Sequence, residues 1–496
     1  MERFLYNSNK GDYTLLMAYP AVEEFALASL GYLWLYKIAD MTEGINALRC
    51  ATDSIDKFKQ PQAAAFSMSF DFDFMGVFEI LEKLGIPFYA NERDENQPLI
   101  FAGGPVITTN PRPYEAFFDF MMIGDGEDSF KKVLEILKNN SKKEALKLLG
   151  NVEGVYIPSK PVKKSTTVLE EVIYTPVLSD KGYFKDTFII EVARGCMNRC
   201  AFCTASYINL PFRNYSYEKI IEAIELGLQY TKKIALLGAQ ISAHPQFEDI
   251  MKYLSDKMDN GVEIELGISS LRTDSVTPQM VQTLVKGGQK HSTIAIEAAS
   301  ERLRKFINKN LKEEQILNAV KVARENGLKG LKIYSMIGIP TETQEDIDEF
   351  LRLGRVIKEE NKGFNIEFSF STFVPKPHTP FQWALREDTK SLEAKQKYLE
   401  KEFAKLGIAS KFSSAKWDYW QSVLSRGGVE LAPFLVEVYK KGGKIGAYKS
   451  TLKDLNISVN ESFDISEELP WDIIEIEPGK LLLINEYNRL NKKASL

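Results

Sequence analysis

Three of the four cysteines in the 496-residue chain lie close together, at positions 196, 200 and 203. Their C-x3-C-x2-C spacing follows shortly after the apolar run 188–190, so a short loop at the end of a predicted strand carries all three thiols. Soft thiolate ligands favour iron-sulfur centres over hard cations. Three protein ligands leave one iron of a [4Fe-4S] cluster open, and we therefore predict that Cys196, Cys200 and Cys203 hold a cluster with one vacant iron.

Other uses of cysteine fit this pattern less well. A structural zinc site closes its tetrahedron with four protein ligands, and the nearest histidine, His244, lies well outside the loop. A disulfide would pair two of the thiols, leave the third without a partner and require an oxidising compartment. Core packing is the usual fate of a free cysteine and suits Cys50, but it does not account for three thiols within eight positions.

The cysteine loop, with Phe202 before its last cysteine, resembles the signature loop of the radical S-adenosylmethionine (SAM) superfamily. The resemblance implies that the amino and carboxylate groups of SAM chelate the open iron. Electron transfer from an external donor such as flavodoxin or ferredoxin would then cleave SAM to a 5′-deoxyadenosyl radical, which abstracts hydrogen from an unreactive carbon. In such enzymes the cofactors carry the chemistry, and the protein positions them and excludes water.

Length and composition describe a globular protein with more than one domain. A chain of 496 residues exceeds what one hydrophobic core usually holds, and 44% apolar with 26% charged residues is ordinary for globular proteins. The net charge of −5 argues against a broad nucleic-acid surface. No apolar run approaches the roughly 18 residues that a membrane span needs, and the amino terminus has no signal-peptide pattern. We expect a cytoplasmic protein without a membrane or nucleic-acid partner.

Residues 1–150 alternate strand and helix patterns, which predicts a Rossmann-like open sheet with mostly parallel strands. Ligands of such sheets bind beyond the carboxyl ends of the strands, where glycine lets the backbone approach a flat cofactor closely. The expected strands are 13–20, 63–69, 99–105 and 118–127, with helices at 22–38 and 74–84. The residues expected at the two glycine-bearing strand ends are Gly103, Gly104, Gly124, Gly126 and Glu127.

The order of these elements ahead of the cysteine loop is similar to that of radical SAM proteins with a cobalamin-binding domain. This chain departs from the best-known cobalamin pattern, because its histidines are His244, His291 and His378 and the D-x-H-x-x-G motif is absent. The resemblance therefore implies cobalamin bound without a histidine lower ligand. The alternatives are that residues 1–150 are a degenerate relic or a substrate-binding module.

Three further regions complete the expected domain order. Residues 151–186 are typical of a linker with small β elements. Residues 187–388 contain about six strand-helix units, which suits the partial (β/α)6 barrel of the radical SAM fold, with its chemistry at the carboxyl ends of the strands. Residues 389–496 are expected to be an α-rich accessory region. The expected barrel strands are 188–192, 234–237, 262–268, 293–296, 331–336 and 366–373.

Several segments at these strand ends resemble the SAM-binding motifs of the superfamily. Residues 238–240 take the place of the GGE-like motif that receives the methionine ammonium, with Ala239 and Gln240 where the family has glycine and acid. Residues 297–304 resemble the segment whose acid and serine meet the ribose and whose arginine pairs the SAM carboxylate. The turn 338–340 resembles the adenine-contacting G-x-P turn. The implied SAM-binding residues are Phe202, Gly238, Gln240, Ser270, Glu297, Ser300, Arg304, Gly338 and Pro340.

Taken singly, each of these segments also has an ordinary structural explanation. Glu301 and Lys305 form a common i,i+4 helix pair, and 338–340 is a common turn. The loop 373–383 holds three prolines and three aromatic residues around His378, which predicts a stiff barrel-mouth loop. His378 either gates the mouth and contacts substrate or is a structural hydrogen-bonding residue, and we favour the structural role.

The resulting functional hypothesis is a radical SAM enzyme, with possible cobalamin-assisted methyl transfer to an unknown substrate. One alternative is a methylthiotransferase that modifies tRNA or protein, but that family carries a second cluster on three amino-terminal cysteines and this chain has only Cys50 there. The other is a non-enzymatic iron-sulfur redox sensor, but electron-transfer clusters normally have four protein ligands.

Overall fold

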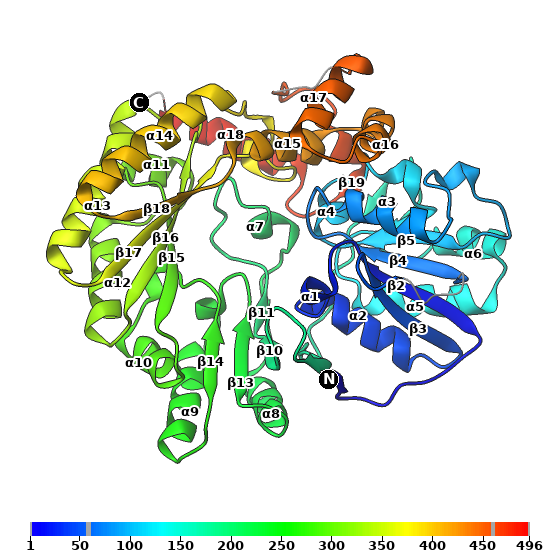
Figure 1. The fold of residues 1–496 in the computed structure, drawn as a ribbon, viewed down its shortest axis with the longest axis horizontal. Coiled ribbons are helices and arrows are strands. Elements are labelled where there is room, and N and C mark those ends of the chain that lie inside the picture. Colours follow the sequence, from blue (N-terminus) through cyan, green and yellow to red (C-terminus); the bar gives the residue numbers. More distant parts are fainter. Residues whose placement is uncertain (1, 56–60, 458–461, 495–496) are drawn as a thin grey trace.

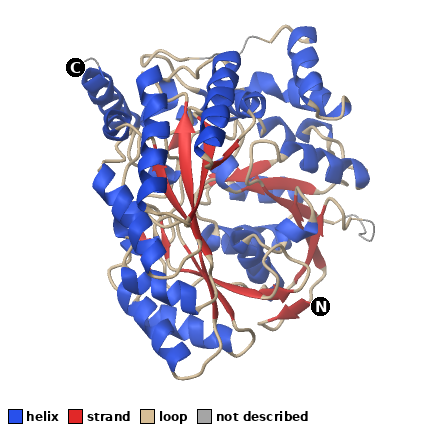
Figure 2. Ribbon diagram, turned by 60° about the vertical axis from the view of Figure 1, so that its left-hand side comes forward, coloured by secondary structure: helices blue, strands red, loops and turns tan. Residues whose placement is uncertain are grey.

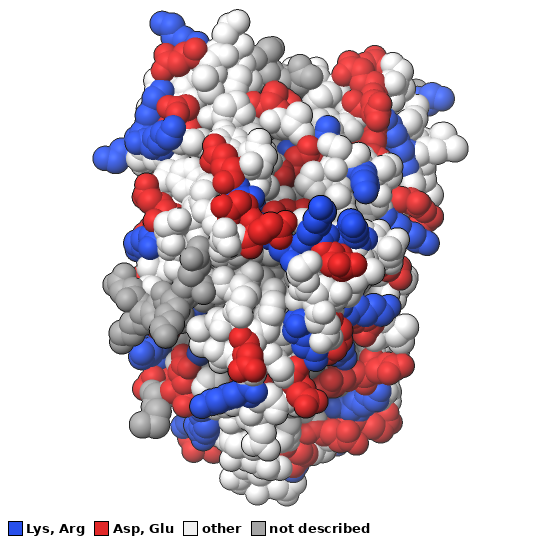
Figure 3. All heavy atoms as spheres, turned by 90° about the vertical axis from the view of Figure 1, so that its right-hand side faces the viewer, with Lys and Arg blue, Asp and Glu red and all other residues white. Residues whose placement is uncertain are grey.

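Two α/β units lie beside each other, and carboxyl-terminal helices run across both at one end (Figure 1). The computed structural model describes residues 2–55, 61–457 and 462–494. The amino-terminal unit, in blue and cyan, stands next to a curved set of strands in green and yellow. On its outer side, acidic and basic side chains are interspersed (Figure 3). Every helix in the described ranges is too short or too polar to cross a bilayer.

The amino-terminal unit is the open sheet that the sequence predicts. Its strand order is β3-β2-β4-β5-β6-β7, and all neighbours are parallel except the last pair. The strands are β2 (Tyr13–Tyr19), β3 (Ile45–Ala51), β4 (Ala63–Ser67), β5 (Leu99–Gly103), β6 (Phe120–Met122) and β7 (Val155–Tyr156). The helices are α1 (Glu23–Ala26), α2 (Leu30–Met41), α3 (Phe74–Lys83), α4 (Pro105–Thr109), α5 (Glu127–Asn139) and α6 (Lys142–Leu149).

The second unit is a partial barrel of parallel strands in two sheets. The first sheet has the order β10-β13-β14 and the second β15-β16-β17-β18, and a single parallel bridge between Leu271 and Ile294 connects them. The strands are β10 (Thr187–Glu191), β13 (Lys233–Leu237), β14 (Glu265–Ile268), β15 (His291–Glu297), β16 (Gly330–Ile337), β17 (Asn365–Thr372) and β18 (Ala409–Phe412). All six expected strands are present, and β18 extends the sheet beyond them.

Helices cover the outer side of these strands (Figure 2). They are α8 (Tyr217–Leu228), α9 (Phe247–Asp259), α10 (Pro278–Lys286), α11 (Glu301–Phe306), α12 (Glu313–Glu325), α13 (Gln344–Glu360) and α14 (Thr389–Leu406). Alternation along β16 separates the two faces, because Ile333 is fully buried in the core under the helices whereas its neighbour Tyr334 is 42% exposed on the inner face. The barrel interior is therefore open at the level of Tyr334.

Short elements tie the two units together. Strand β9 (Val177–Ser179) pairs with β1 (Glu2–Phe4), and β8 (Val162–Lys163) pairs with β19 (Ile474–Glu475). The remaining short strands are β11 (Ala193–Arg194) and β12 (Arg213–Asn214). The remaining helices are α7 (Ala205–Ile208), α15 (Ala415–Arg426), α16 (Ala432–Lys440), α17 (Ile445–Asp454) and α18 (Lys480–Ala494).

Polar side chains also join the barrel-mouth loop to the amino-terminal unit. Lys376 pairs with the buried Asp71 at 2.8 Å, and Gln421 donates to the same carboxylate at 3.1 Å. His378 is buried and hydrogen bonds to the backbone of Thr109. The contact with Thr109 fits the expected structural role, while Nε2 of His378 has no hydrogen-bond partner among the described residues.

We predict that His378 makes the protein less stable as the pH falls. Burial lowers the pKa of His378 from 6.5 to about 4, so the folded protein keeps it neutral while the unfolded chain protonates it. Above pH 6.5 the imidazole is neutral in both states, and stability is not reduced by His378. Between pH 6.5 and pH 4 only the unfolded chain takes up the proton, so the free energy of unfolding falls. Against a His378→Gln variant, the wild type should lose up to about 3 kcal/mol of unfolding free energy over this window in urea denaturation. His291→Gln, at an exposed position, is the control, and superimposable pH profiles for wild type and His378→Gln would contradict the prediction.

Candidate active site

The cysteine loop, residues 195–203, lies just beyond the carboxyl end of β10. Its turn begins at Gly195, which has a φ of +88°. A Cβ at this position would lie 2.4 Å from the carbonyl oxygen of Asn209, so the turn requires glycine. The segment before the loop is fixed by antiparallel pairing of β11 with β12.

The three predicted cluster ligands share one site. All three are free thiols, and Cys196 and Cys200 are buried. Burial is the main cause that raises the pKa of the Cys200 thiol to about 12, and Cys203 and Cys196 raise it as well. Burial also raises the pKa of Cys203, with a contribution from Cys196. The thiols are therefore close enough to influence one another electrostatically, and iron binding would release their protons.

The donor set fits an iron-sulfur cluster. Three thiols from one loop supply soft ligands and leave one iron without a protein ligand. Each thiolate of a cubane cluster binds a different iron, so the sulfurs surround a cube rather than one ion. In the described ranges, no group of three or more His, Cys, Asp or Glu side chains is arranged around a single metal ion.

Gln240 is the predicted SAM-binding residue that touches the cysteine loop directly. Its Oε1 lies 3.3 Å from the Sγ of Cys196 and accepts a hydrogen bond from Asn198 at 2.5 Å. Asn198 is itself 3.4 Å from the same sulfur. Gln240 thus presents a carbonyl oxygen beside the first cysteine, in the place where the superfamily has an acid.

A lysine that was not expected from the sequence lies close to Cys200. Lys309 pairs with Glu297 at 3.1 Å, and both side chains are mostly buried. Burial by itself would lower the pKa of Lys309, but the carboxylate of Glu297 and the thiol of Cys200 hold it above its ordinary value. Glu297 ends β15 with a φ of +65°, which is uncommon outside glycine. No motif marks position 309, so its proximity emerges only from the fold.

Two predicted SAM contacts, Arg304 and Ser300, make hydrogen bonds within the scaffold. Arg304 is fully buried, and its guanidinium donates to the carbonyl oxygens of Leu311 at 2.6 Å, Ala298 at 3.1 Å and Ala299. Ser300 accepts the N–H of Leu303 as the cap of α11 and donates to Asp346 at 2.5 Å. Their hydrogen bonds hold the start of α11, so the structure does not direct either side chain at the cysteine loop.

The remaining predicted SAM residues differ in their surroundings. Phe202 packs in an apolar cluster with Ala298 and Ile339, which brings the cysteine loop, the end of β15 and the turn at Gly338 and Pro340 together. Gly338 has a φ of +77° and its N–H donates to Glu342 at 2.9 Å. A Cβ on Gly238 would lie 3.0 Å from the carbonyl oxygen of Ala193. Ser270 is exposed.

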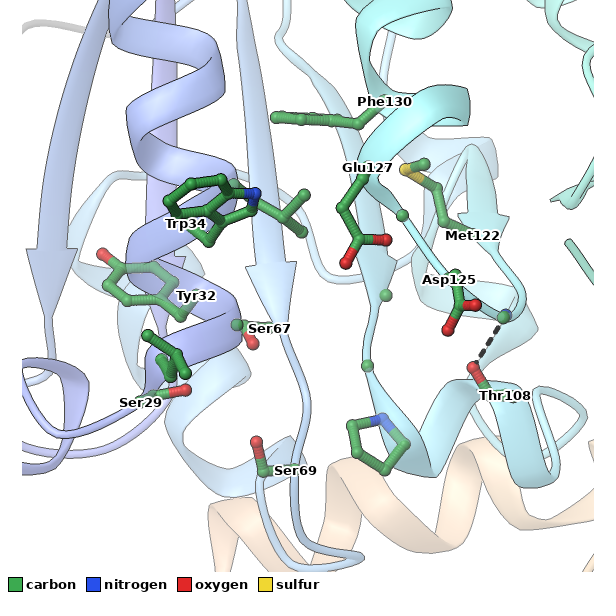
Figure 4. A pocket seen from close by; sticks show the side chains of 18 of the residues that line it. Ser29, Tyr32, Trp34, Ser67, Ser69, Thr108, Met122, Asp125, Glu127 and Phe130 are labelled. Carbon is green, nitrogen blue, oxygen red and sulfur yellow. Dashed lines mark hydrogen bonds between the residues drawn. The ribbon is translucent and has the colours of Figure 1, made fainter. Parts of the chain in front are cut away.

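A cavity of about 410 Å³ lies between the amino-terminal sheet and the start of the barrel. Tyr32 and Trp34 of α2 form one wall, and Ser67, Met122 and Phe130 stand around it (Figure 4). The barrel contributes Glu191, Arg194 and Leu237. The lining includes all five residues expected at the glycine-bearing strand ends, which are Gly103, Gly104, Gly124, Gly126 and Glu127.

Backbone packing explains two of these glycines. Gly104 has a φ of +110°, and a Cβ on it would lie 2.4 Å from the carbonyl oxygen of Met68. Gly124 has a φ of +98°, and a Cβ on it would lie 2.3 Å from the carbonyl oxygen of Ser165. Gly103 and Gly126 have ordinary φ values, and a Cβ on either would come no closer to a neighbouring atom than 3.5 and 3.4 Å respectively, which is ordinary van der Waals contact. Gly104 and Gly124 are therefore required by the chain itself.

A buried ion-pair network joins this cavity to the cysteine loop. Arg194, two residues before Cys196, pairs with Asp125 at 3.0 Å, Glu127 at 2.7 Å and Glu191 at 2.8 Å. Arg213 pairs with Asp125 at 2.6 Å. Burial alone would raise the pKa of the Asp125 carboxyl, but these two guanidinium groups hold it below its usual value.

Comparison with known proteins places this site in a family. A profile described as radical SAM proteins, N-terminal, matches residues 29–158, and the profile of the radical SAM superfamily matches residues 190–354. An uncharacterized protein of Methanocaldococcus jannaschii is 31% identical over 411 residues, which cover 81% of this chain and 85% of that protein. The chain belongs to the radical SAM superfamily. It is an enzyme of this superfamily, whose cofactors are a [4Fe-4S] cluster and SAM, as the cysteine loop predicts.

Other similar proteins include an uncharacterized methyltransferase of Pyrococcus horikoshii, which is 25% identical over 281 residues. The match covers 54% of this chain and 60% of that protein. Two solved structures share the fold. OxsB with aqua-cobalamin and SAM bound has a TM-score of 0.57 at 14% identity, with 97% of this chain and 80% of that chain covered. TsrM from Kitasatospora setae with cobalamin and a [4Fe-4S] cluster bound has a TM-score of 0.54 at 12% identity. The match covers 90% of this chain and 99% of that chain.

We predict that alanine is tolerated at Gly103 but not at Gly104. Gly104→Ala forces a side chain into a backbone conformation that only glycine adopts readily and into contact with Met68, which should cost at least about 2 kcal/mol of unfolding free energy. Gly103→Ala, the matched control one residue earlier, should stay within about 1 kcal/mol of the wild type. Urea denaturation measures both. Equal stability of the two variants would show that the strand end does not have this geometry.

Proposed function

We propose that this radical SAM enzyme uses Cys196, Cys200 and Cys203 to bind a [4Fe-4S] cluster, and that it abstracts hydrogen from its substrate after reductive cleavage of SAM. The observation that carries the proposal is the convergence of three free thiols at the carboxyl end of β10, beside the Glu297–Lys309 pair. The cluster, when bound, supplies the electron and the open iron for this chemistry.

The surrounding side chains suit the amino acid part of SAM. Lys309 is a buried cation close to Cys200, so it can pair with a carboxylate at the open corner of the site. The carbonyl oxygen of Gln240 beside Cys196 can accept a hydrogen bond from an ammonium. We assign the carboxylate contact to Lys309 in place of Arg304, because the guanidinium of Arg304 bonds to backbone oxygens.

We further propose that the cavity beside the amino-terminal sheet binds cobalamin and that the reaction is methyl transfer. Its walls are largely apolar and aromatic, and it lies at the carboxyl ends of parallel strands, where such sheets bind ligands. The lining contains no histidine, so a bound corrinoid would have no imidazole from these residues below cobalt. OxsB and TsrM, which share the fold, are described with cobalamin bound.

We expect anaerobically reconstituted protein to release 5′-deoxyadenosine from SAM when a reductant is supplied. Cys200→Ala should remove most of the iron and abolish the release, because a cluster held by only two thiols loses its binding site. Cys50→Ala is the matched control, since Cys50 is equally buried but lies in the amino-terminal sheet. Iron analysis and chromatography of the nucleoside products measure both effects. Normal cleavage by Cys200→Ala would refute the cluster assignment.

We expect Lys309→Met to weaken SAM binding. Loss of one charge-assisted hydrogen bond should raise the Kd for SAM about tenfold or more, as measured by equilibrium dialysis of reconstituted protein. Lys305→Met, at an exposed position on α11, should leave the Kd unchanged. An unchanged Kd in Lys309→Met, with normal iron content, would assign the SAM carboxylate to another residue.

A further inference from the structure

Glu127 faces the cavity and the cysteine loop at the same time. It is the first residue of α5, directly after the turn that follows β6. One carboxylate oxygen, Oε1, lies 2.7 Å from Nη2 of Arg194. The other, Oε2, is buried and has no hydrogen-bond partner among the described residues. Figure 4 shows the Glu127 side chain pointing into the cavity, on the side of Met122 and Asp125 that faces Trp34.

In the other two carboxylates around Arg194, both oxygens already have hydrogen-bond or ion-pair partners. Asp125 uses Oδ1 for Arg194, and its Oδ2 accepts from Arg213 at 2.6 Å and from the N–H of Thr167 at 3.0 Å. Glu191 binds Nε and Nη2 of Arg194 with its two oxygens and also accepts from Tyr215 at 3.1 Å. Glu127 is thus the member of this trio whose second oxygen is left for a cavity ligand.

Arg194 connects Glu127 to the segment that leads into the cysteine loop. Its Nε, Nη1 and Nη2 all contact carboxylates, so the guanidinium cannot move without breaking buried ion pairs. The arginine belongs to β11, and Gly195 and Cys196 follow it directly. A single side chain, Arg194, therefore links Glu127 to the segment that carries Cys196.

We propose that Glu127 is a positioning residue that couples the ligand of the cavity to the cysteine loop. One of its oxygens accepts a hydrogen bond from an amide N–H of a bound corrinoid, and the other holds Arg194. An ionised carboxylate only accepts hydrogen bonds, and the rim of a corrinoid carries primary amides that donate them. The inference rests on the proposed assignment of this cavity to cobalamin.

Two variants separate the two contacts of Glu127. Glutamine at position 127 keeps one carbonyl oxygen as an acceptor and replaces the other oxygen with an NH2 group, which only donates, so one of the two acceptor positions is lost. Glu127→Gln should therefore raise the Kd for hydroxocobalamin about tenfold. Arg194→Lys keeps the acceptor for the corrinoid but cannot reach three carboxylates with one ammonium group. The Kd of the Arg194→Lys variant for hydroxocobalamin should stay within about threefold of the wild-type value.

The experiment measures corrinoid binding by absorbance after ultrafiltration, and the electron paramagnetic resonance spectrum of the reduced cluster with and without saturating corrinoid. In the wild type, corrinoid binding should change the spectrum. In Glu127→Gln and Arg194→Lys the spectrum should no longer respond. Glu115→Gln is the matched control, because Glu115 pairs with Arg112 at 3.0 Å in the same unit but does not line the cavity. It should behave as the wild type.

The outcomes are distinguishable. If both variants bind corrinoid and respond as the wild type does, the coupling through Glu127 is wrong although the cavity assignment stands. If the wild type itself retains no hydroxocobalamin, the cavity assignment and this inference both fall. The release of 5′-deoxyadenosine tests the cluster and SAM chemistry separately in either case.

Discussion

Three thiols can share one site in this protein because β10 stops at Glu191 and the chain turns sharply at Gly195. The turn leaves no room for a Cβ, and Arg194 just before it is fixed by three buried carboxylates. Breaking a buried pair by removing one partner leaves an uncompensated charge, so such a network holds its members in one arrangement. Two of the three carboxylates, Asp125 and Glu127, come from the amino-terminal unit, and the position of the cysteine loop therefore depends on the packing of both units.

Two cavities also lie on either side of one residue, Leu237. Leu237 at the end of β13 lines the cavity beside the amino-terminal sheet and a second cavity of about 770 Å³ on the inner side of β10, β13 and β14. Its side chain is 39% exposed, so it contacts both spaces rather than the helical core. A ligand held by the glycine-bearing strand ends would thus lie next to the barrel interior, where the thiols and the Glu297–Lys309 pair also meet. The proposed methyl transfer would need a methyl carrier close to the hydrogen-abstracting site.

Much of the fold could be predicted from the sequence because buried parallel strands are short apolar runs. The strands β2, β4, β5 and β10 have this character, and β15 and β17 alternate apolar with polar residues at the period of a strand. The sequence analysis missed β3, an edge strand that contains Asn46 and Arg49, and β18, whose four residues include Ser410 and Lys411. Strands with polar residues at a sheet edge carry little apolar signal, so they become visible only through their pairing.

The site was harder to predict than the fold. The three cysteines could be predicted as cluster ligands from their local spacing, because this chemistry depends on how many cysteines one loop carries. Lys309 carries no such mark, since it reaches the thiols only through the turn after α11. Arg304 was assigned to a ligand because sequence shows a charge but not the carbonyl oxygens that surround it. Gly104 and Gly124 were expected to admit a cofactor, and the structure gives them a second reason, which is close packing against Met68 and Ser165.

The central claim is that the three cysteines leave one iron of a cluster open for SAM. Electron-nuclear double resonance of the reduced, reconstituted protein with SAM labelled by nitrogen-15 at its amino group tests it most directly. We expect a nitrogen coupling strong enough to show that the amino group binds iron, and we expect it to disappear in Cys196→Ala. A cluster that binds SAM tightly without any nitrogen coupling, or one that survives in Cys196→Ala, would contradict it.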